Sequence, residues 1–345
     1  MNKYRPLVLM VLSGIIALIF LIIGVQEKGQ ILTYDGQTQL VYRNATSDMT
    51  IERVAQIQKH NSELEQSLIF AHWAMVERTM LHNQELNKYA EAEVLAISGH
   101  IKAFLPMSNH SMLEENTCIV DAETAFFLFG TTAVVGNTIF YNEVEYEIAE
   151  IIQNITNIFI YAAGDEDENH FNRVTILNST EMKRDVARKF SVHYGTWEVV
   201  DNEVYVTIMT ILLLFIPAGM SFALLKLVYG YYKEAKEQWK LQVLWGGIGL
   251  LIFTVSLWYA GSFVEMASDM IPNRWSDFEF WGLWWTEYMK GIHNLIQVEK
   301  SPYEKMEFWN FIKSMLWIFL AIFSTVHAYI NYKRISQRVW KVIRK

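Results

Sequence analysis

The chain has 345 residues, of which 52% are hydrophobic and 14% aromatic, and its formal net charge is −8. Apolar residues gathered in a few long blocks indicate a membrane protein rather than a globular enzyme. A negative chain offers no basic face to nucleic acid, which excludes that class of partner. A single cysteine, Cys118, excludes an intramolecular disulfide and a cysteine metal site, and we expect it to be a small buried residue.

The first predicted element is a membrane-spanning helix within residues 1–24. Residues 6–24 form an almost unbroken apolar run that follows Lys3 and Arg5. A cleaved signal peptide is the alternative, but the run is longer than the roughly 7–15 apolar residues of a signal peptide. The VQEKGQ that follows also lacks a small-residue cleavage site. We therefore expect a retained helix.

Residues 25–203 are predicted to form a mixed α+β domain. Apolar residues at helical spacing predict a helix over 49–77, with Ser47 or Asp48 as its cap. Shorter patterns predict strands, helices and a hairpin further on. These are strands at 117–120, 157–162 and 173–177, helices at 121–129 and 179–190 (capped by Ser179 or Thr180), and a hairpin over 138–152 that turns at 141–143.

Residues 204–345 are predicted to hold three further membrane helices, over 204–229, 241–264 and 309–329. Each has about the 20 residues that a bilayer core requires. The connection 265–308 is rich in tryptophan, which is typical of a helix at the membrane interface, and an aromatic substrate groove is the alternative.

Basic residues in three short flanks orient these helices. They precede the first helix, fill the connection between the second and third (Lys233, Lys236, Lys240), and follow the fourth as a basic tail. The first and last flanks place the two termini in the cytoplasm, and the middle flank places the connection between the second and third helices there too. The predicted fold is therefore a plasma-membrane protein with four transmembrane helices and an α+β extracytoplasmic domain inserted between helices 1 and 2.

The sequence offers no constellation for bond chemistry. It lacks a G-x-x-x-x-G-K-[ST] phosphate loop, an H-E-x-x-H zinc motif and a G-x-S-x-G elbow. The acidic run 165–169 starts like a calcium loop, but His170 and Ile176 stand where such a loop needs Gly and Glu. We expect no enzyme activity, metal or cofactor. In the third helix, Gly246, Gly247 and Gly249 would allow close helix packing.

One helix, a large outer domain and three further helices is a layout that resembles the MacB/FtsX family of ABC transporter permeases. Residues 118–152 also resemble the family's outer domain, with a strand, a helix that ends in Leu128-Phe129-Gly130, a Val135-Gly136-x-x-Ile139 turn and a strand pair. Asn172-Arg173-Val174 resembles the next strand of the family.

The resemblance implies a permease subunit, expected to be homodimeric, that couples a separate cytosolic ATPase to its outer domain. ATP would be bound by that partner alone. Family members have a coupling helix after the second span, and a different sequence, residues 232–239, stands here in that place. The predicted ATPase-docking residues are Lys233, Glu234, Lys236 and Glu237. Export or extraction of a peptide, lipid or drug would fit, as would activation of an outer protein. An anchored sensor or assembly protein without an ATPase is the alternative.

Overall fold

The computed structural model describes residues 5–31, 36–43, 49–153, 155–165, 167–177, 183–235, 238–263 and 278–343. The chain divides into two compact units. We call residues 1–33, 203–271 and 307–345 the helical unit, and residues 34–202 and 272–306 the sheet unit.

The helical unit is built from long helices at the positions that the sequence predicted. These are α1 (Arg5–Ile31), α6 (Glu203–Glu234), α7 (Trp239–Phe263) and α9 (Pro302–Ile343), whose first five residues belong to the sheet unit. Among the described residues, α1, α7 and α9 are long and apolar enough to cross a membrane. Helix α6 has a shorter described apolar stretch, Glu203–Phe215, so a count of four spans stays a prediction.

Small and polar residues join α1 to α9 in this unit. A Cβ built at Gly24 would lie 3.0 Å from Ile318 Cγ1, and Ser314 Oγ donates to the Gly24 carbonyl at 2.9 Å. Further along, Ser13 Oγ lies 2.7 Å from His327 Nδ1. Because Gly24 has no side chain, the two helices can approach closely there.

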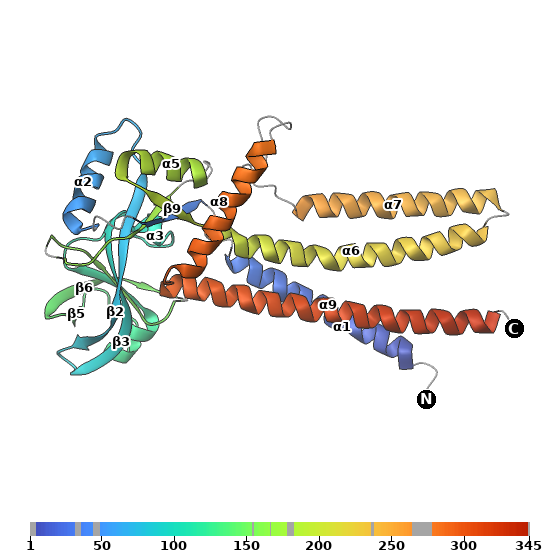
Figure 1. Ribbon diagram of the computed structural model, residues 1–345. Coiled ribbons are helices and arrows are strands. Elements are labelled where there is room, and N and C mark those ends of the chain that lie inside the picture. Colours follow the sequence, from blue (N-terminus) through green and yellow to red (C-terminus); the bar gives the residue numbers. More distant parts are fainter. Residues whose placement is uncertain are drawn as a thin grey trace. The chain divides into compact units, whose positions relative to one another are not determined.

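Helices α6 and α7 lie side by side (Figure 1), joined by a short connection. The rings of Tyr231 and Trp245 stack with centroids 4.8 Å apart, and Ser256 Oγ donates to Ser221 Oγ at 2.7 Å.

The described strands of the sheet unit form one nine-stranded sheet in the order β3-β7-β4-β6-β5-β2-β8-β1-β9. The strands are β1 (Gln37–Tyr42), β2 (Ile69–Asn83), β3 (Lys88–Gly99), β4 (Thr117–Asp121), β5 (Thr138–Tyr141), β6 (Val144–Ile152), β7 (Ile158–Ala162), β8 (Arg173–Leu177) and β9 (Trp197–Val200). Strand β2 also pairs with β3, so six strands close into a ring. A register shift between Val76 and Thr79 separates the two halves of β2. Before the shift, Ile69–Trp73 pair with β8, and after it, His82 pairs with Phe140 of β5.

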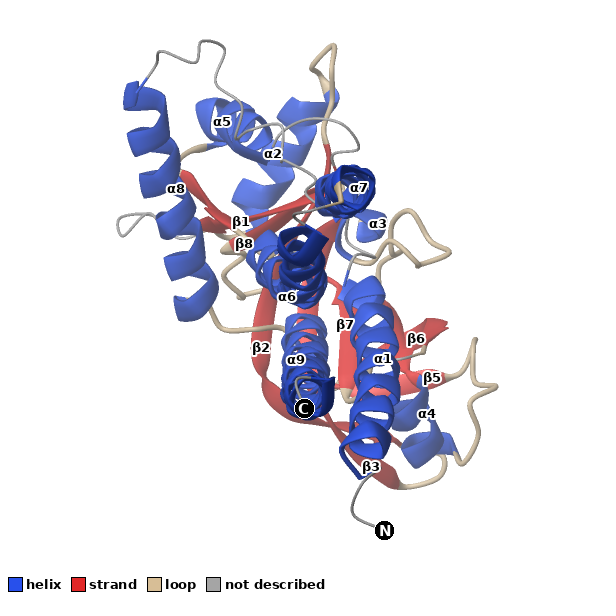
Figure 2. Cartoon of the chain, turned by 90° about the vertical axis from the view of Figure 1, so that its right-hand side faces the viewer, coloured by secondary structure: helices blue, strands red, loops and turns tan. Residues whose placement is uncertain are grey.

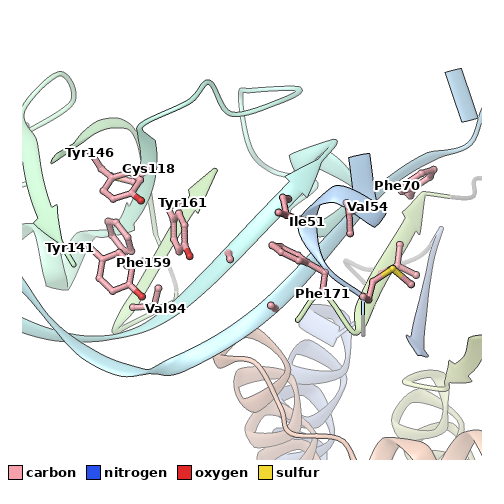
Figure 3. Packing of buried hydrophobic residues seen from close by; sticks show 14 of the residues in the cluster. Ile51, Val54, Phe70, Val94, Cys118, Tyr141, Tyr146, Phe159, Tyr161 and Phe171 are labelled. Atoms are coloured by element: carbon pink, nitrogen blue, oxygen red, sulfur yellow. The ribbon is translucent and has the colours of Figure 1, made fainter. Parts of the chain in front are cut away.

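Alternate residues of the strands feed two hydrophobic clusters, as the pleat of a β-strand requires. Val94 and Phe159 belong to the larger cluster, while their neighbours Leu95 and Ile158 belong to the smaller one. The larger cluster contains an aromatic group with Tyr141, which Figure 3 shows beside Phe159.

Helices α2 (Ile51–Ser62), α4 (Ala122–Phe129) and α5 (Lys183–Tyr194) contribute to the larger cluster, and α3 (Ile101–Phe104) to the smaller one. Figure 2 shows α2 and α5 near the β1–β8 end of the sheet. The aromatic rings of His60 on α2 and Tyr194 on α5 lie edge to face, with centroids 5.7 Å apart.

Several sequence predictions between residues 117 and 177 are confirmed. Strands β4, β7 and β8, helix α4 and the β5–β6 hairpin all lie where they were expected. The Asp121 carboxylate caps α4 by accepting from the backbone N–H groups of Glu123 and Thr124, and Gly130 ends the helix at φ 76°. The hairpin turns at Asn142 and Glu143, both with positive φ. Cys118 is buried as predicted.

The prediction of a helix over 49–77 is wrong beyond its first half. Helix α2 ends at Ser62, and β2 begins at Ile69. The Asn61 side chain accepts from Leu68 N and donates to Leu68 O, both at 2.9 Å, which fixes the loop between them. Strand β2 then pairs with β3 and β8, and this tertiary pairing overrides the helical spacing. Thr50 precedes helix α2, and its expected caps, Ser47 and Asp48, lie outside the described residues. The caps expected for the later helix, Ser179 and Thr180, also lie outside them.

Candidate functional site

The predicted ATPase-docking residues lie around the connection between α6 and α7. Lys233 is exposed in the last turn of α6, and Glu234 is the last residue of that helix. Lys236 and Glu237 lie outside the described residues. Gln238 N donates to Ala235 O at 2.9 Å, and α7 begins at the exposed Trp239. This connection joins two long helices, and its docking role stays a prediction.

The three glycines of α7 differ in their surroundings. A Cβ at Gly249 would lie 3.5 Å from Val228 of α6, and one at Gly246 would lie 3.9 Å from Tyr232. A Cβ at Gly247 would meet no described atom within 4 Å outside its own helix. Gly246 and Gly249 therefore share the face toward α6, at helical spacing, while Gly247 points elsewhere.

The start of α9 forms a second site, which sequence reasoning missed. Ser301-Pro302-Tyr303-Glu304 is a capping box, in which Glu304 N donates to Ser301 Oγ at 3.2 Å and Ser301 N donates to the Glu304 carboxylate at 2.8 Å. Pro302 occupies the first helical position, which it favours. This S-P-x-E pattern is readable in the sequence and predicts a helix start seven residues before the expected span at 309.

A buried ion pair joins this helix start to the sheet. The guanidinium of Arg173 on β8 lies 2.5 Å from the Glu304 carboxylate, and both side chains are almost fully buried. Arg173 also donates to the Glu299 carbonyl at 3.2 Å and lies over the Trp73 ring at 4.4 Å. A charged group away from water needs such partners, so each half of the pair depends on the other.

Apolar and charged contacts extend this attachment along the first turn of α9. Tyr303 belongs to the smaller hydrophobic cluster, with its ring centroid 6.4 Å from that of Phe104. Lys305 Nζ lies 2.7 Å from the Glu93 carboxylate on β3. The beginning of α9 is therefore part of the core of the sheet unit.

Helix α8 (Phe278–Gln297) is fixed to the edge strand β9. Asn294 Nδ2 donates to the Val199 carbonyl at 3.0 Å, and Lys290 Nζ lies 2.8 Å from the Glu198 carboxylate. A Cβ at Gly291 would lie 3.0 Å from Asp201 Cβ, so glycine permits this close approach. The helix thereby covers a sheet edge that would otherwise offer unpaired backbone groups.

Electrostatics support the same attachment. Burial would raise the pKa of Glu198, but the hydrogen bond and charge of Lys290 outweigh it, together with Asn294 and Arg43, so this pKa lies below its ordinary value. The carboxylate stays ionised and keeps its partners at neutral pH. We refer to residues 278–306, which carry all these contacts, as the α8–α9 segment.

Among the described residues, no three His, Cys, Asp or Glu side chains gather as metal ligands. Burial, and to a lesser extent Glu147, raises the pKa of the Cys118 thiol, which disfavours its thiolate. The contacts at the start of α9 hold its first turn to the sheet.

Comparison with known proteins gave structural neighbours only. No family model and no curated protein sequence matches the chain. The periplasmic region of MacB from Actinobacillus actinomycetemcomitans aligns with 51% of this chain and 95% of its own, at 10% identity and a TM-score of 0.38. The extracellular domain of the ABC-type transporter YknZ from Gram-positive bacteria aligns with 48% of this chain and 100% of its own, at 13% identity and a TM-score of 0.34. A domain of a permease protein from Porphyromonas gingivalis aligns with 47% and 85%, at 10% identity and a TM-score of 0.32.

Proposed function

We propose that this chain is the permease subunit of an ABC-type transporter or mechanotransmission complex of the MacB/FtsX type. Four helices would cross the bacterial plasma membrane, with both termini in the cytoplasm and the sheet unit outside. Two copies would pair with a separate cytosolic ATPase. ATP-driven motion would reach the sheet unit and serve to export or extract a peptide, lipid or drug, or to activate an outer partner.

The observation that carries this proposal is the continuity of α9. This helix runs without interruption from Pro302 to Ile343. Its second residue, Tyr303, belongs to the smaller hydrophobic cluster, and its candidate span, Pro302–Ile335, ends with basic residues such as Lys333 and Arg334. Its 42 residues correspond to about 63 Å at 1.5 Å per residue, which exceeds the roughly 40–45 Å of a whole bilayer. Such a helix can carry a displacement from one side of a membrane to the other.

The attachment of α9 supports transmission rather than simple anchoring. A displacement of its first turn would act on β8 through Arg173 and Glu304, and on β3 through Lys305 and Glu93. Buried and paired groups resist sliding, since a small shift leaves charges without partners. The sheet would therefore follow the helix.

The ATPase partner rests on the sequence resemblance and on the predicted docking residues. A pull-down of the tagged full chain from mild detergent, with identification of bound proteins by mass spectrometry, tests it. Three forms are compared: the native chain, a docking variant with Lys233, Glu234, Lys236 and Glu237 changed to Ala, and a control variant. The control changes exposed charges of the same number and sign in the sheet unit to Ala, namely Lys59, Lys88, Glu63 and Glu65.

We expect a nucleotide-binding ATPase with the native chain and the control, and its loss from the docking variant. If no ATPase accompanies any form, the proposal loses its energy source. The chain would then be better described as an anchored sensor or assembly protein.

A further inference from the structure

Helix α8 has an apolar face that its attachment to the sheet leaves uncovered. Trp281, Trp285, Met289, Ile292 and Ile296 recur every three or four residues. At 100° per residue they fall within an arc of about 80°. Among them Trp285 is 57% exposed and Ile296 is 72% exposed.

The other faces of this helix are occupied differently. Gly291, Asn294 and Leu295 are buried, and the close approach to Asp201 and the bond to Val199 place this side against β9. Thr286 and His293 are exposed on a polar side that contains no large apolar residue apart from Leu283. Helix α8 therefore has a protein-facing side, a polar side and a separate apolar stripe.

We propose that the apolar stripe of α8 inserts into the outer surface of the lipid bilayer and holds the sheet unit against the membrane. The interaction does not require an ATPase and goes beyond the proposed function. It requires only that the chain is embedded in a bilayer.

Chain continuity selects lipid as the partner of this stripe. Helix α8 lies between two candidate membrane spans, α7 and α9. Ile296 is six residues before Pro302, so the two lie at most about 21 Å apart even if the link is fully extended. Seven residues further along, α9 presents the exposed Trp309 within its candidate span, Pro302–Ile335. The stripe is thus tethered near the level at which tryptophan favours the lipid headgroups.

The composition of α8 also fits a helix that lies on a membrane rather than one that crosses it. With 20 residues it is long enough to span, yet among the described residues it is not one of the helices apolar enough to do so. An apolar stripe with two tryptophans beside a polar face is the pattern of an interfacial helix. Because α8 is already a helix fixed to β9, it would not have to fold when it binds the membrane.

The test places a fluorescent probe at single positions of the full chain in lipid nanodiscs. In a C118A background, W285C and M289C label the stripe, while T286C and H293C label the polar side of the same helix. Each is labelled with an environment-sensitive dye. Quenching by nitroxide-labelled phosphatidylcholine is compared with quenching by iodide in the water. The unlabelled C118A form gives the background signal. A variant whose melting temperature equals that of the C118A form is folded.

We expect lipid quenching and blue-shifted emission at 285 and 289, and iodide quenching at 286 and 293. Iodide quenching at all four positions would overturn the proposal, because the stripe would face water. Protection of 285 and 289 from both quenchers would overturn it too, because protein would cover the stripe. Disulfide cross-linking through W285C would then identify a second copy as that cover.

Discussion

The start of α9 and the connection between α6 and α7 are built in opposite ways. At the start of α9, Arg173 and Glu304 are buried and bonded to each other, and Tyr303 lies in a hydrophobic cluster. At the connection, Lys233 and Trp239 are exposed at the ends of their helices. Buried charges with fixed partners make a permanent internal joint. Exposed charges and aromatic side chains suit a partner that binds from solution. Substitutions at the two places should therefore have opposite consequences, a loss of stability at the first and a loss of binding at the second.

The largest effect is expected from E304A. This substitution leaves the Arg173 guanidinium buried without its carboxylate, which should cost about 3–5 kcal/mol of unfolding free energy. The double variant R173M/E304L leaves no charge behind and should recover most of that loss. Thermal unfolding of the purified full chain measures both. The control is D185A, which removes an exposed pair with Arg188 and should change little. A stability of E304A equal to that of D185A would show that the joint is not formed.

Buried His72 should make the stability of the folded chain depend on pH, because a charge at this position would have no partner. His72 is fully buried among Phe70, Phe190 and Trp197, and neither ring nitrogen has a hydrogen-bond partner among the described residues. Burial lowers its pKa from 6.5 to about 3. Between these values the unfolded chain binds a proton that the folded chain does not, so stability falls as the pH drops below 6.5.

Lowering the pH from 7 to 5 should therefore cost about 2 kcal/mol through His72 alone. The variant H72F removes this contribution and should lose less stability at pH 5 than the native chain does. Thermal unfolding at the two pH values measures the difference. The control is H293F, which removes an exposed imidazole from α8. An unchanged pH dependence in H72F would contradict the assignment.

A smaller effect is expected for glycines of α8. Alanine favours a helix over glycine by about 1 kcal/mol, and a Cβ at Gly282 would meet no described atom within 4 Å outside its helix, so G282A should stabilise the chain. At Gly291 the same substitution places a methyl group 3.0 Å from Asp201 Cβ. G291A should therefore destabilise the chain by about 1 kcal/mol or more, as overpacking does. Equal melting temperatures for the two variants would mean that α8 does not pack on β9.

The smallest effect on stability is expected at the α6–α7 connection. Exposed surface charges usually contribute within about 0.5 kcal/mol, so the docking variant described above should melt like the native chain. Its defect should be confined to partner binding. A lowered melting temperature would instead make these residues part of the fold, and the contrast between the two sites would fail.

Features that depend on local chemistry could be predicted from the amino-acid sequence. Long apolar runs predicted the positions of α1, α6, α7 and α9, because a bilayer core demands length and hydrophobicity that few other environments select. Gly130 predicted the end of α4, since a left-handed residue acts on its own neighbours, and the structure adds Asp121 as the cap at its start. The capping box at Ser301 belongs to the same class, because its two hydrogen bonds join residues only three positions apart.

Features that depend on residues far apart in the sequence could not be predicted from local patterns. Residues 69–77 continue a helical spacing, yet they form a strand because β3 and β8 pair with them. Arg173 stands in a strand with nothing nearby in sequence to neutralise it, and its partner Glu304 is 131 residues away. The tryptophans of residues 265–308 predicted a helix at the membrane interface, but they gave no sign that one side of α8 and the first turn of α9 pack into the sheet unit. Local patterns cannot report such contacts, because burial and pairing energies are set by the groups that the fold brings together.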